Sequence, residues 1–191
     1  MKIGLIADTH MPGSIRELWP QVFEAFRDAD CILHAGDLHT LDIVDRLSEI
    51  APTYVAAGNG DVGLVDDRLQ HTWLLEHSGV HIGMIHQFPS PQRRSYEQLE
   101  NYMCRHFGDA LPHVMVFGHT HKESIHHVNN LLCINPGSPT LPQNQSLRHG
   151  TIGTLEIEAD ALCASIWQIH DEGVSQHAEI APLRVQLAHP R

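Results

Sequence analysis

Seven residues whose side chains bind metal ions occur in five short motifs of this chain. The motifs are Asp-x-His, Gly-Asp, Gly-Asn, a single His and His-x-His, and the residues are Asp8, His10, Asp37, Asn59, His86, His119 and His121. Carboxylate, imidazole and amide groups together suit manganese, iron, zinc or nickel in mixed nitrogen and oxygen coordination. Seven ligands are too many for one ion but suit two, and one carboxylate has two oxygens with which to bridge them. The set therefore predicts a two-metal centre.

Each motif follows an apolar run that has the length of a β-strand. These runs are residues 2–7, 31–35, 53–57, 81–85 and 113–117. Apolar residues at helical spacing, such as Val22 with Phe26 and Val44 with Leu47, lie between the first strands. Three strand-to-helix units in sequence predict a parallel sheet with right-handed crossovers. Because ligands of open α/β sheets bind at the carboxyl ends of strands, we expect the seven side chains to meet at one edge.

The spacing within the motifs supports the same interpretation. In Asp-x-His and His-x-His, the two outer residues point to the same side when the backbone is extended. Glycines before Asp37, Asn59 and His119 allow the chain to turn sharply after each strand. Each motif alone is a weak signal, because an isolated histidine at a strand end is more often a packing or surface residue. The joint occurrence of all five, each at a strand end, indicates chemistry.

The remainder of the chain predicts more β-structure around one helix. Two strands are expected, at residues 71–77 and 81–85, separated by Ser78 and Gly79. A helix is expected to begin after Ser95, whose spacing to Gln98 is typical of a capping box, and to end before Gly108. The last third predicts only strands, at residues 123–128, 131–135, 151–158 and 162–169. We expect one domain over residues 1–181 and a loosely held C-terminal tail over residues 182–191.

The composition limits the classes of partner. The chain of 191 residues has a formal net charge of -11, so binding to polymeric nucleic acid through counterion release is not expected. The four cysteines form no Cys-x-x-Cys pair, and no apolar stretch has the length of a signal peptide or a membrane helix. We therefore expect a cytoplasmic protein without a membrane partner. Its substrate would be a small phosphate ester, with nucleic acid limited to a small nucleotide, and a homo-oligomer stays an open alternative.

With these motifs in place, the chain resembles the calcineurin-type metallophosphoesterases, in their short branch of bacterial and archaeal phosphodiesterases. The resemblance runs from residue 3 to about residue 140 and includes Asn-Pro-Gly-Ser at residues 135–138. It implies a four-layer α/β/β/α sandwich of two mixed β-sheets with the metals at the sheet edges. It also implies that Asp37 bridges two ions. The remaining ligands are Asp8, His10 and His121 for one ion and Asn59, His86 and His119 for the other.

The resemblance further implies hydrolysis of a phosphate ester by a metal-bound hydroxide. Two metals about 3.5–4 Å apart clamp phosphate oxygens and can lower the pKa of a water to about 7. Manganese is the expected ion, with iron, zinc, nickel and cobalt as alternatives. Asp37, Asn59 and His119 are the expected catalytic residues, and Asn59 is also an expected substrate contact.

One position departs from the wider family, in which a histidine that assists the leaving group follows Gly-Asn. Here that position is Gly60, and the short branch commonly lacks this histidine as well. His39, two residues past Asp37, is a candidate supporting catalytic residue, although a solvated histidine at the start of a helix is the commoner case. Arg93, next to Arg94, is either a substrate contact or one of an exposed pair before Ser95.

The favoured function is therefore that of a two-metal phosphodiesterase. One alternative is a phosphomonoesterase of the same superfamily. Another is a non-catalytic scaffold for protein interactions, because a subunit of the eukaryotic retromer coat shares this fold. A DNA-repair nuclease would need added domains for which the chain has no room. Metal-binding residue types at all seven positions favour the enzyme over the scaffold.

Overall fold

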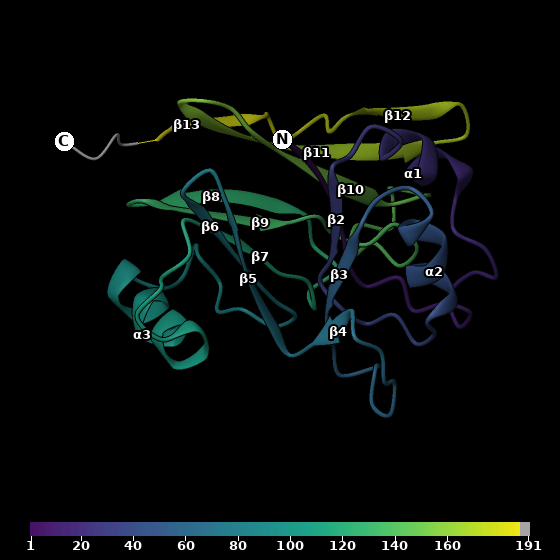
Figure 1. The fold of residues 1–191 in the computed structure, drawn as a ribbon. Helices are drawn as coiled ribbons and strands as arrows, with labels where there is room; N and C mark the ends of the chain where they lie inside the picture. Colours follow the sequence, from purple (N-terminus) through teal and green to yellow (C-terminus); the bar gives the residue numbers. More distant parts are fainter. Residues whose placement is uncertain (188–191) are drawn as a thin grey trace.

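Two β-sheets pack face to face and carry helices on both outer sides in the computed structural model, which describes residues 1–187 (Figure 1). Helices α1 (Pro20–Ala25) and α2 (Asp42–Ser48) pack against the larger sheet, and α3 (Tyr96–Phe107) packs against the smaller one. The layers are therefore α/β/β/α, as the resemblance implied. None of the helices within residues 1–187 is long and apolar enough to cross a membrane.

The larger sheet contains the strands that precede the first three motifs. Its members are β1 (Lys2–Ile6), β2 (Cys31–His34), β3 (Thr53–Ala56), β4 (Leu69–Gln70), β10 (Thr151–Ile157), β11 (Ala161–His170), β12 (Gly173–Gln176) and β13 (Leu183–Gln186). They lie in the order β12-β11-β10-β1-β2-β3-β4, and β13 pairs with the other end of β11. Strands β1 to β4 are parallel, whereas β10 pairs antiparallel with β1. The sheet is therefore mixed.

The smaller sheet contains the strands that precede the last two motifs. Its members are β5 (Thr72–His77), β6 (Val80–Ile85), β7 (Val114–Val116), β8 (Ser124–Val128) and β9 (Leu131–Asn135). They lie in the order β5-β6-β7-β9-β8, with β6, β7 and β9 parallel and the two edge strands antiparallel to their neighbours. The two strands predicted at residues 71–77 and 81–85 are present as β5 and β6, which pair antiparallel.

Three hydrophobic cores hold the four layers together. In β2, Cys31 and Leu33 face the core between the sheets, whereas Ile32 packs in the core beneath α1 and α2. In β7, Met115 packs beside α3, and its two neighbours face the larger sheet. Because these strands are buried on both faces, they are continuous apolar runs in the sequence and do not alternate.

The predicted caps of α3 are confirmed. Ser95 Oγ accepts a hydrogen bond from Gln98 N at 3.4 Å, and Gln98 Oε1 accepts one from Ser95 N at 3.1 Å. Gly108 follows the last turn with φ of 66°. Asn129, in the turn between β8 and β9, has φ of 54°. From β8 to residue 187 the chain contains strands and loops alone, as predicted.

Two expectations were wrong. The third strand-to-helix unit does not form, because residues 57–68 make a loop from β3 to β4; this segment has three glycines and no apolar stripe. The predicted tail from residue 182 also contains a strand, since β13 pairs antiparallel with residues 161–164 of β11. Leu183 and Val185 pack against the core between the sheets, while Arg184 and Gln186 are exposed. Residues 188–191 of that tail lie outside the described residues.

Close packing between β1 and the end of α1 generates a prediction about stability. The ring of Phe26 is fully buried, and a Cβ on Gly4 would lie 2.8 Å from it. Gly4→Ala should therefore lower the free energy of unfolding by about 1–3 kcal/mol through overpacking. In a Phe26→Leu background the same substitution should cost less, because the ring edge is gone. Urea denaturation of the four proteins measures both costs, and equal costs in the two backgrounds would contradict this packing argument.

Candidate metal centre

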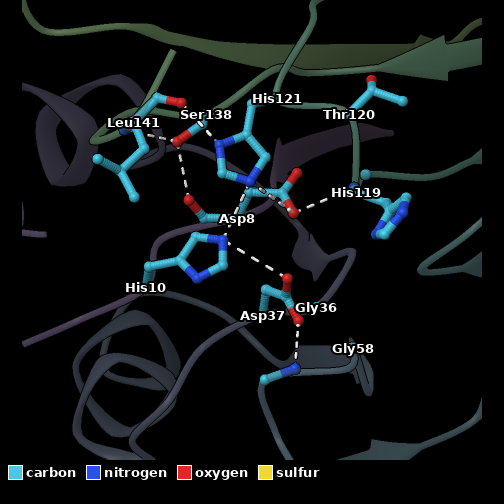
Figure 2. A network of polar contacts seen from close by, with 12 residues as sticks. Asp8, His10, Gly36, Asp37, Gly58, His119, Thr120, His121, Ser138 and Leu141 are labelled. Carbon is cyan, nitrogen blue, oxygen red and sulfur yellow. Dashed lines mark hydrogen bonds and ion pairs between the residues drawn. The ribbon is translucent and has the colours of Figure 1, made fainter. Parts of the chain in front are cut away.

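The carboxyl ends of five strands bring the seven predicted residues together at one edge of the sandwich. The placements are Asp8 and His10 after β1, Asp37 after β2, Asn59 after β3, His86 after β6, and His119 with His121 after β7. Figure 2 shows Asp8, His10, Asp37 and His121 turned toward one another. Strands of both sheets contribute, so the site lies where the two sheets meet.

The residues expected to hold the first ion are in contact. His10 Nε2 lies 3.1 Å from His121 Nε2, and His121 Nε2 lies 3.8 Å from Asp8 Oδ1. One ligand atom from each of these three residues lies within 4.8 Å of the other two. The three side chains are therefore close enough to share one cation.

The residues expected to hold the second ion form an adjoining group. Asn59 Oδ1 lies 3.3 Å from His86 Nε2 and 3.2 Å from His119 Nδ1. Asp37 Oδ2 lies 3.5 Å from His86 Nε2 and also 3.5 Å from His10 Nε2. One carboxylate oxygen thus contacts an imidazole of each expected set, which is the position that a bridging ligand requires.

In two of the histidines, the ring nitrogen that faces away from the site has a hydrogen-bond partner that determines which nitrogen carries the proton. His86 Nδ1 donates to the carbonyl of Ala35 at 2.7 Å, and His121 Nδ1 donates to the carbonyl of Leu141 at 2.7 Å. Because a carbonyl oxygen only accepts, the proton lies on Nδ1 and the Nε2 lone pair faces the site. This is the arrangement that orients metal-binding histidines in general.

The backbone at the site is left-handed, which the sequence interpretation missed. Six of the eight non-glycine residues with positive φ in residues 1–187 belong to the ligand loops: Asp8, His10, Asp37, His39, His119 and His121. The expectation of an extended backbone in Asp-x-His and His-x-His was therefore wrong. Such conformations cost about 1–3 kcal/mol each and gather where function requires them. Aspartate and histidine are among the residues that adopt them most readily.

A carboxylate outside the predicted set organises two of these loops. Asp61 is buried, and its Oδ2 accepts hydrogen bonds from the backbone N–H of Asp37 and Gly58, each at 2.8 Å. Its Oδ1 accepts from the N–H of Leu38 at 2.6 Å and of His39 at 3.0 Å. Asp61 therefore ties the loop after β2 to the loop after β3. Its position in Gly-Asn-Gly-Asp was the available signal.

A buried histidine beneath the site was also missed. His34 Nδ1 accepts from Gly36 N at 3.1 Å, so its Nε2 carries the proton and donates to Thr9 Oγ1 at 3.1 Å. Burial lowers the pKa of His34 to about 4, which keeps the ring neutral. Gly36 has φ of 94°, and a Cβ there would lie 2.7 Å from Gly58 N. The position thus requires glycine for both its conformation and the close approach of the next loop.

The Asn-Pro-Gly-Ser segment supports two of the ligand loops from behind. Asn135 Nδ2 donates to the carbonyl of Gly118 at 3.0 Å. Ser138 Oγ donates to the carbonyl of Asp8 at 2.8 Å, a bond drawn in Figure 2. The segment therefore holds the turns after β1 and β7, which accounts for its presence beside the ligand motifs.

Two carboxylates of the site have opposite electrostatic properties. Burial raises the pKa of Asp8 to about 7, and its Oδ2 is buried without a hydrogen-bond partner. Burial also disfavours the charge of Asp37, but the neighbouring His86 imidazole and a hydrogen bond from Gly60 N outweigh burial and lower the pKa of Asp37. Burial lowers the pKa of His10. Burial also acts to lower the pKa of His86, but the contact of His86 with Asp37 outweighs burial and raises that pKa.

This donor set fits divalent cations. The orphaned oxygen of Asp8 is an acceptor that lacks a positive partner, and Nε2 of His86 and His121 presents a lone pair to the same space. Ligand atoms of Asp8, Asp37 and His86 also lie within 4.8 Å of one another. The structure therefore places Asp8 beside both expected sets, whereas the resemblance assigned it to one.

The two remaining candidates differ in position. His39 lies beside the ligands, with Nε2 2.9 Å from His10 Nδ1. Arg93 and Arg94 are exposed in the turn before α3. Within residues 1–187, neither guanidinium forms a hydrogen bond or an ion pair with the seven expected ligands. The structure thus brings His39 to the site and leaves a substrate contact of Arg93 a prediction.

The buried charge of Asp8 generates a prediction. In chelated protein its folded pKa of about 7 exceeds the ordinary value of 3.8, so its contribution to stability is lost as pH rises from 3.8 to 7. The cost is about 1.4 kcal/mol for each pH unit in that window. At pH 8 with chelator, Asp8→Asn should therefore unfold at a higher temperature than the unmodified protein.

Excess manganese should reverse this order. A ligand at 100 times its Kd stabilises the folded state by about 2.7 kcal/mol. The variant lacks one carboxylate with which to bind manganese, so it should gain less. Thermal unfolding with and without manganese checks the crossing, with Asp67→Asn, at an exposed aspartate, as the control. A chelated unmodified protein as stable as Asp8→Asn at pH 8 would contradict the argument from burial.

Solved structures of other proteins share this fold. Vacuolar Protein Sorting 29 (Vps29) of Cryptosporidium parvum superposes with a TM-score of 0.74 over 98% of both chains at 17% sequence identity. Vps29 of Entamoeba histolytica, solved in complex with zinc, superposes with a TM-score of 0.67 at 24% identity and covers 97% of this chain and 99% of that one. These similarities establish the two-sheet architecture.

Sequence comparisons establish the family. The family model described as the calcineurin-like phosphoesterase superfamily domain matches residues 1–160. A probable metallophosphoesterase of Methanothermobacter thermautotrophicus is 37% identical over 169 residues, which span 87% of this chain and 91% of that protein. The residues matched by the family model include all five ligand motifs. The chain therefore belongs to the calcineurin-like phosphoesterase superfamily.

Proposed function

We propose that this protein is a phosphodiesterase that uses two divalent metal ions to hydrolyse a small phosphate diester. The observation that carries the proposal is the position of Asp37, whose Oδ2 lies 3.5 Å from an imidazole nitrogen of each expected set. The unpartnered Oδ2 of Asp8 beside it supports the same centre. Manganese is the first ion to test, because the donors are mixed nitrogen and oxygen.

The residues of the chain have separate tasks in this reaction. Asp37 spans the two sets, and the other six expected ligands complete them. Bound ions would neutralise phosphate charge and lower the pKa of a water. Asn59, whose Oδ1 lies beside His86 and His119, would orient a phosphate oxygen through its amide N–H. The left-handed loops and Asp61 hold these groups before substrate arrives, which reduces the reorganisation required in the transition state.

The preference for diesters rests on Gly60, which has no side chain to donate a proton to the leaving group. A general acid contributes about 10²–10⁴-fold, and its absence should matter most for poor leaving groups. Gly60 has no left-handed φ, so its backbone conformation does not exclude a side chain. A Cβ there would instead meet the ring of His39, with Cδ2 at 2.6 Å. A direct Gly60→His replacement is thus obstructed by a neighbouring ring.

A scaffold function is the alternative to test, because a protein named for vacuolar protein sorting shares this fold. Because Vps29 of Entamoeba histolytica was solved with zinc, metal content alone does not separate a scaffold from an enzyme. Turnover of a phosphate ester does separate them. Under this proposal the substrate is a small phosphate ester and the protein is located in the cytoplasm.

The proposed bridging role of Asp37 generates a prediction about metal content and turnover. Asp37→Asn retains an oxygen that can accept from Gly60 N, but it loses the charge shared by both sets. The protein should bind about two manganese ions per chain, and Asp37→Asn should lower occupancy at both positions. Asn59→Ala should affect one position alone and cost less turnover. Elemental analysis and kcat measure the two effects, and Asp37→Asn with near-normal turnover would show that the roles are misassigned.

A comparison of phosphate esters tests the substrate class directly. With manganese, kcat/KM for bis(nitrophenyl) phosphate should exceed that for nitrophenyl phosphate, and alkyl monoesters should be nearly inert. The physical reason is that nitrophenolate leaves without a proton, whereas an alkoxide does not. Alkyl monoesters hydrolysed as fast as aryl diesters would favour the phosphomonoesterase. No turnover of any ester by protein that has bound manganese would favour the scaffold.

A further inference from the structure

We propose that His39 is a positioning residue of the metal centre: its imidazole accepts the Nδ1 proton of His10 and fills the space in front of Gly60. The inference rests on the proposed metal centre and deepens it. It adds a residue outside the ligand motifs and accounts for the missing side chain at position 60. It assigns no proton transfer to His39.

The first observation is the set of partners on the outward nitrogens of the ligand histidines. Those of His86 and His121 donate to backbone carbonyls at 2.7 Å. The corresponding nitrogen of His10 faces a side chain instead, with His39 Nε2 at 2.9 Å and the two rings nearly perpendicular at 88°. Since His10 Nε2 faces His121 and Asp37, its proton belongs on Nδ1 when Nε2 binds a metal. His39 is then the acceptor.

The second observation is how the backbone of His39 is held. Its φ is 71°, a conformation that costs free energy for a residue with a side chain. Its N–H donates to Asp61 Oδ1 at 3.0 Å, and the same oxygen accepts from Leu38, which is fully buried. The ring is thus aimed at His10 by a fixed loop, although the residue itself is exposed. An exposed histidine without a role would not need this support.

The third observation is the space in front of Gly60. A Cβ on Gly60 would lie 2.6 Å from Cδ2 of His39, closer still to its Nε2, and 3.2 Å from Asp37 Oδ1. Real Cβ atoms do not approach neighbours this closely, so the ring would have to leave its position. The imidazole at 39 and a side chain at 60 therefore exclude each other. Gly60 is required because His39 occupies the space.

Cobalt(II) titration of the intact protein tests the proposal. Loss of a residue that orients a metal-binding histidine costs about 10–100-fold in affinity. His39→Ala should lower the affinity for one of the two cobalt ions by that amount and leave the affinity for the other unchanged, because His10 belongs to one ligand set. His39→Gln should restore most of the affinity, since its amide oxygen can accept from His10 Nδ1. His71→Ala, at an exposed histidine outside the site, is the control and should change neither affinity.

Proton NMR of the cobalt-loaded protein gives a signal that a general loss of stability would not produce. The Nδ1 protons of His10, His86 and His121 should appear as shifted, exchangeable resonances. In His39→Ala one resonance should vanish through exchange with solvent, while the two protons bonded to carbonyls persist. In His39→Gln all three should remain.

The exclusion between positions 39 and 60 is tested by a double-mutant cycle. Gly60→Ala should weaken cobalt binding when His39 is present and have little effect when residue 39 is alanine. Equal effects in the two backgrounds would overturn the exclusion. Unchanged cobalt affinities in His39→Ala, whatever its turnover, would overturn the positioning role while the metal centre stands. An unmodified protein that binds no cobalt, manganese or zinc would overturn both the inference and the proposed function.

Discussion

Four backbone N–H groups converge on the carboxylate of Asp61, and the rest of the site depends on this set of hydrogen bonds. They join the loop that carries Asp37 to the loop that carries Asn59, although the two loops follow different strands. Each N–H lies at a turn where no strand or helix partner is available, and a buried unpaired N–H would cost about 1–3 kcal/mol. The carboxylate satisfies all four at once. The geometry of the ligands is therefore supported by ordinary backbone hydrogen bonding.

Three carboxylates of the site, so close in space, differ in what surrounds them. Asp61 is saturated by backbone donors, whereas Asp37 accepts from Gly60 N and contacts two imidazoles. Asp8 accepts from His119 N through Oδ1 and has a buried, unpartnered Oδ2. The pKa values of Asp37 and Asp8 are displaced in opposite directions as a result. Residues of one chemical type thus have separate roles that are set by their environment. Because the chain has a formal charge of -11, cations at this edge are also what would attract an anionic phosphate.

Much of this arrangement could be predicted from the sequence. The parts that could not be predicted have a common cause. The strands that end at Asp8, Asp37 and His119 were predictable because runs buried on both faces are continuous and apolar. The capping box of α3 was predictable because it depends on residues three apart. Local patterns mark the positions of Asp61 and His39, but the roles of these residues depend on the approach of loops distant in sequence, which such patterns do not encode. Strand β13 alternates apolar and polar residues, but it was missed because four residues are too short for this pattern to distinguish a strand from a tail.

Strand β11 has ten residues, and its outer edge is covered by the two short strands that follow it in the chain. β12 pairs with residues 167–170, and β13 pairs with residues 161–164. The unpaired N–H and C=O groups of a long strand edge would otherwise be a template for another polypeptide. The last described segment of the chain thus closes a surface through which copies of the protein could join edge to edge. Residues 183–186 thereby cover part of an edge that would otherwise be open to pairing, a role separate from catalysis.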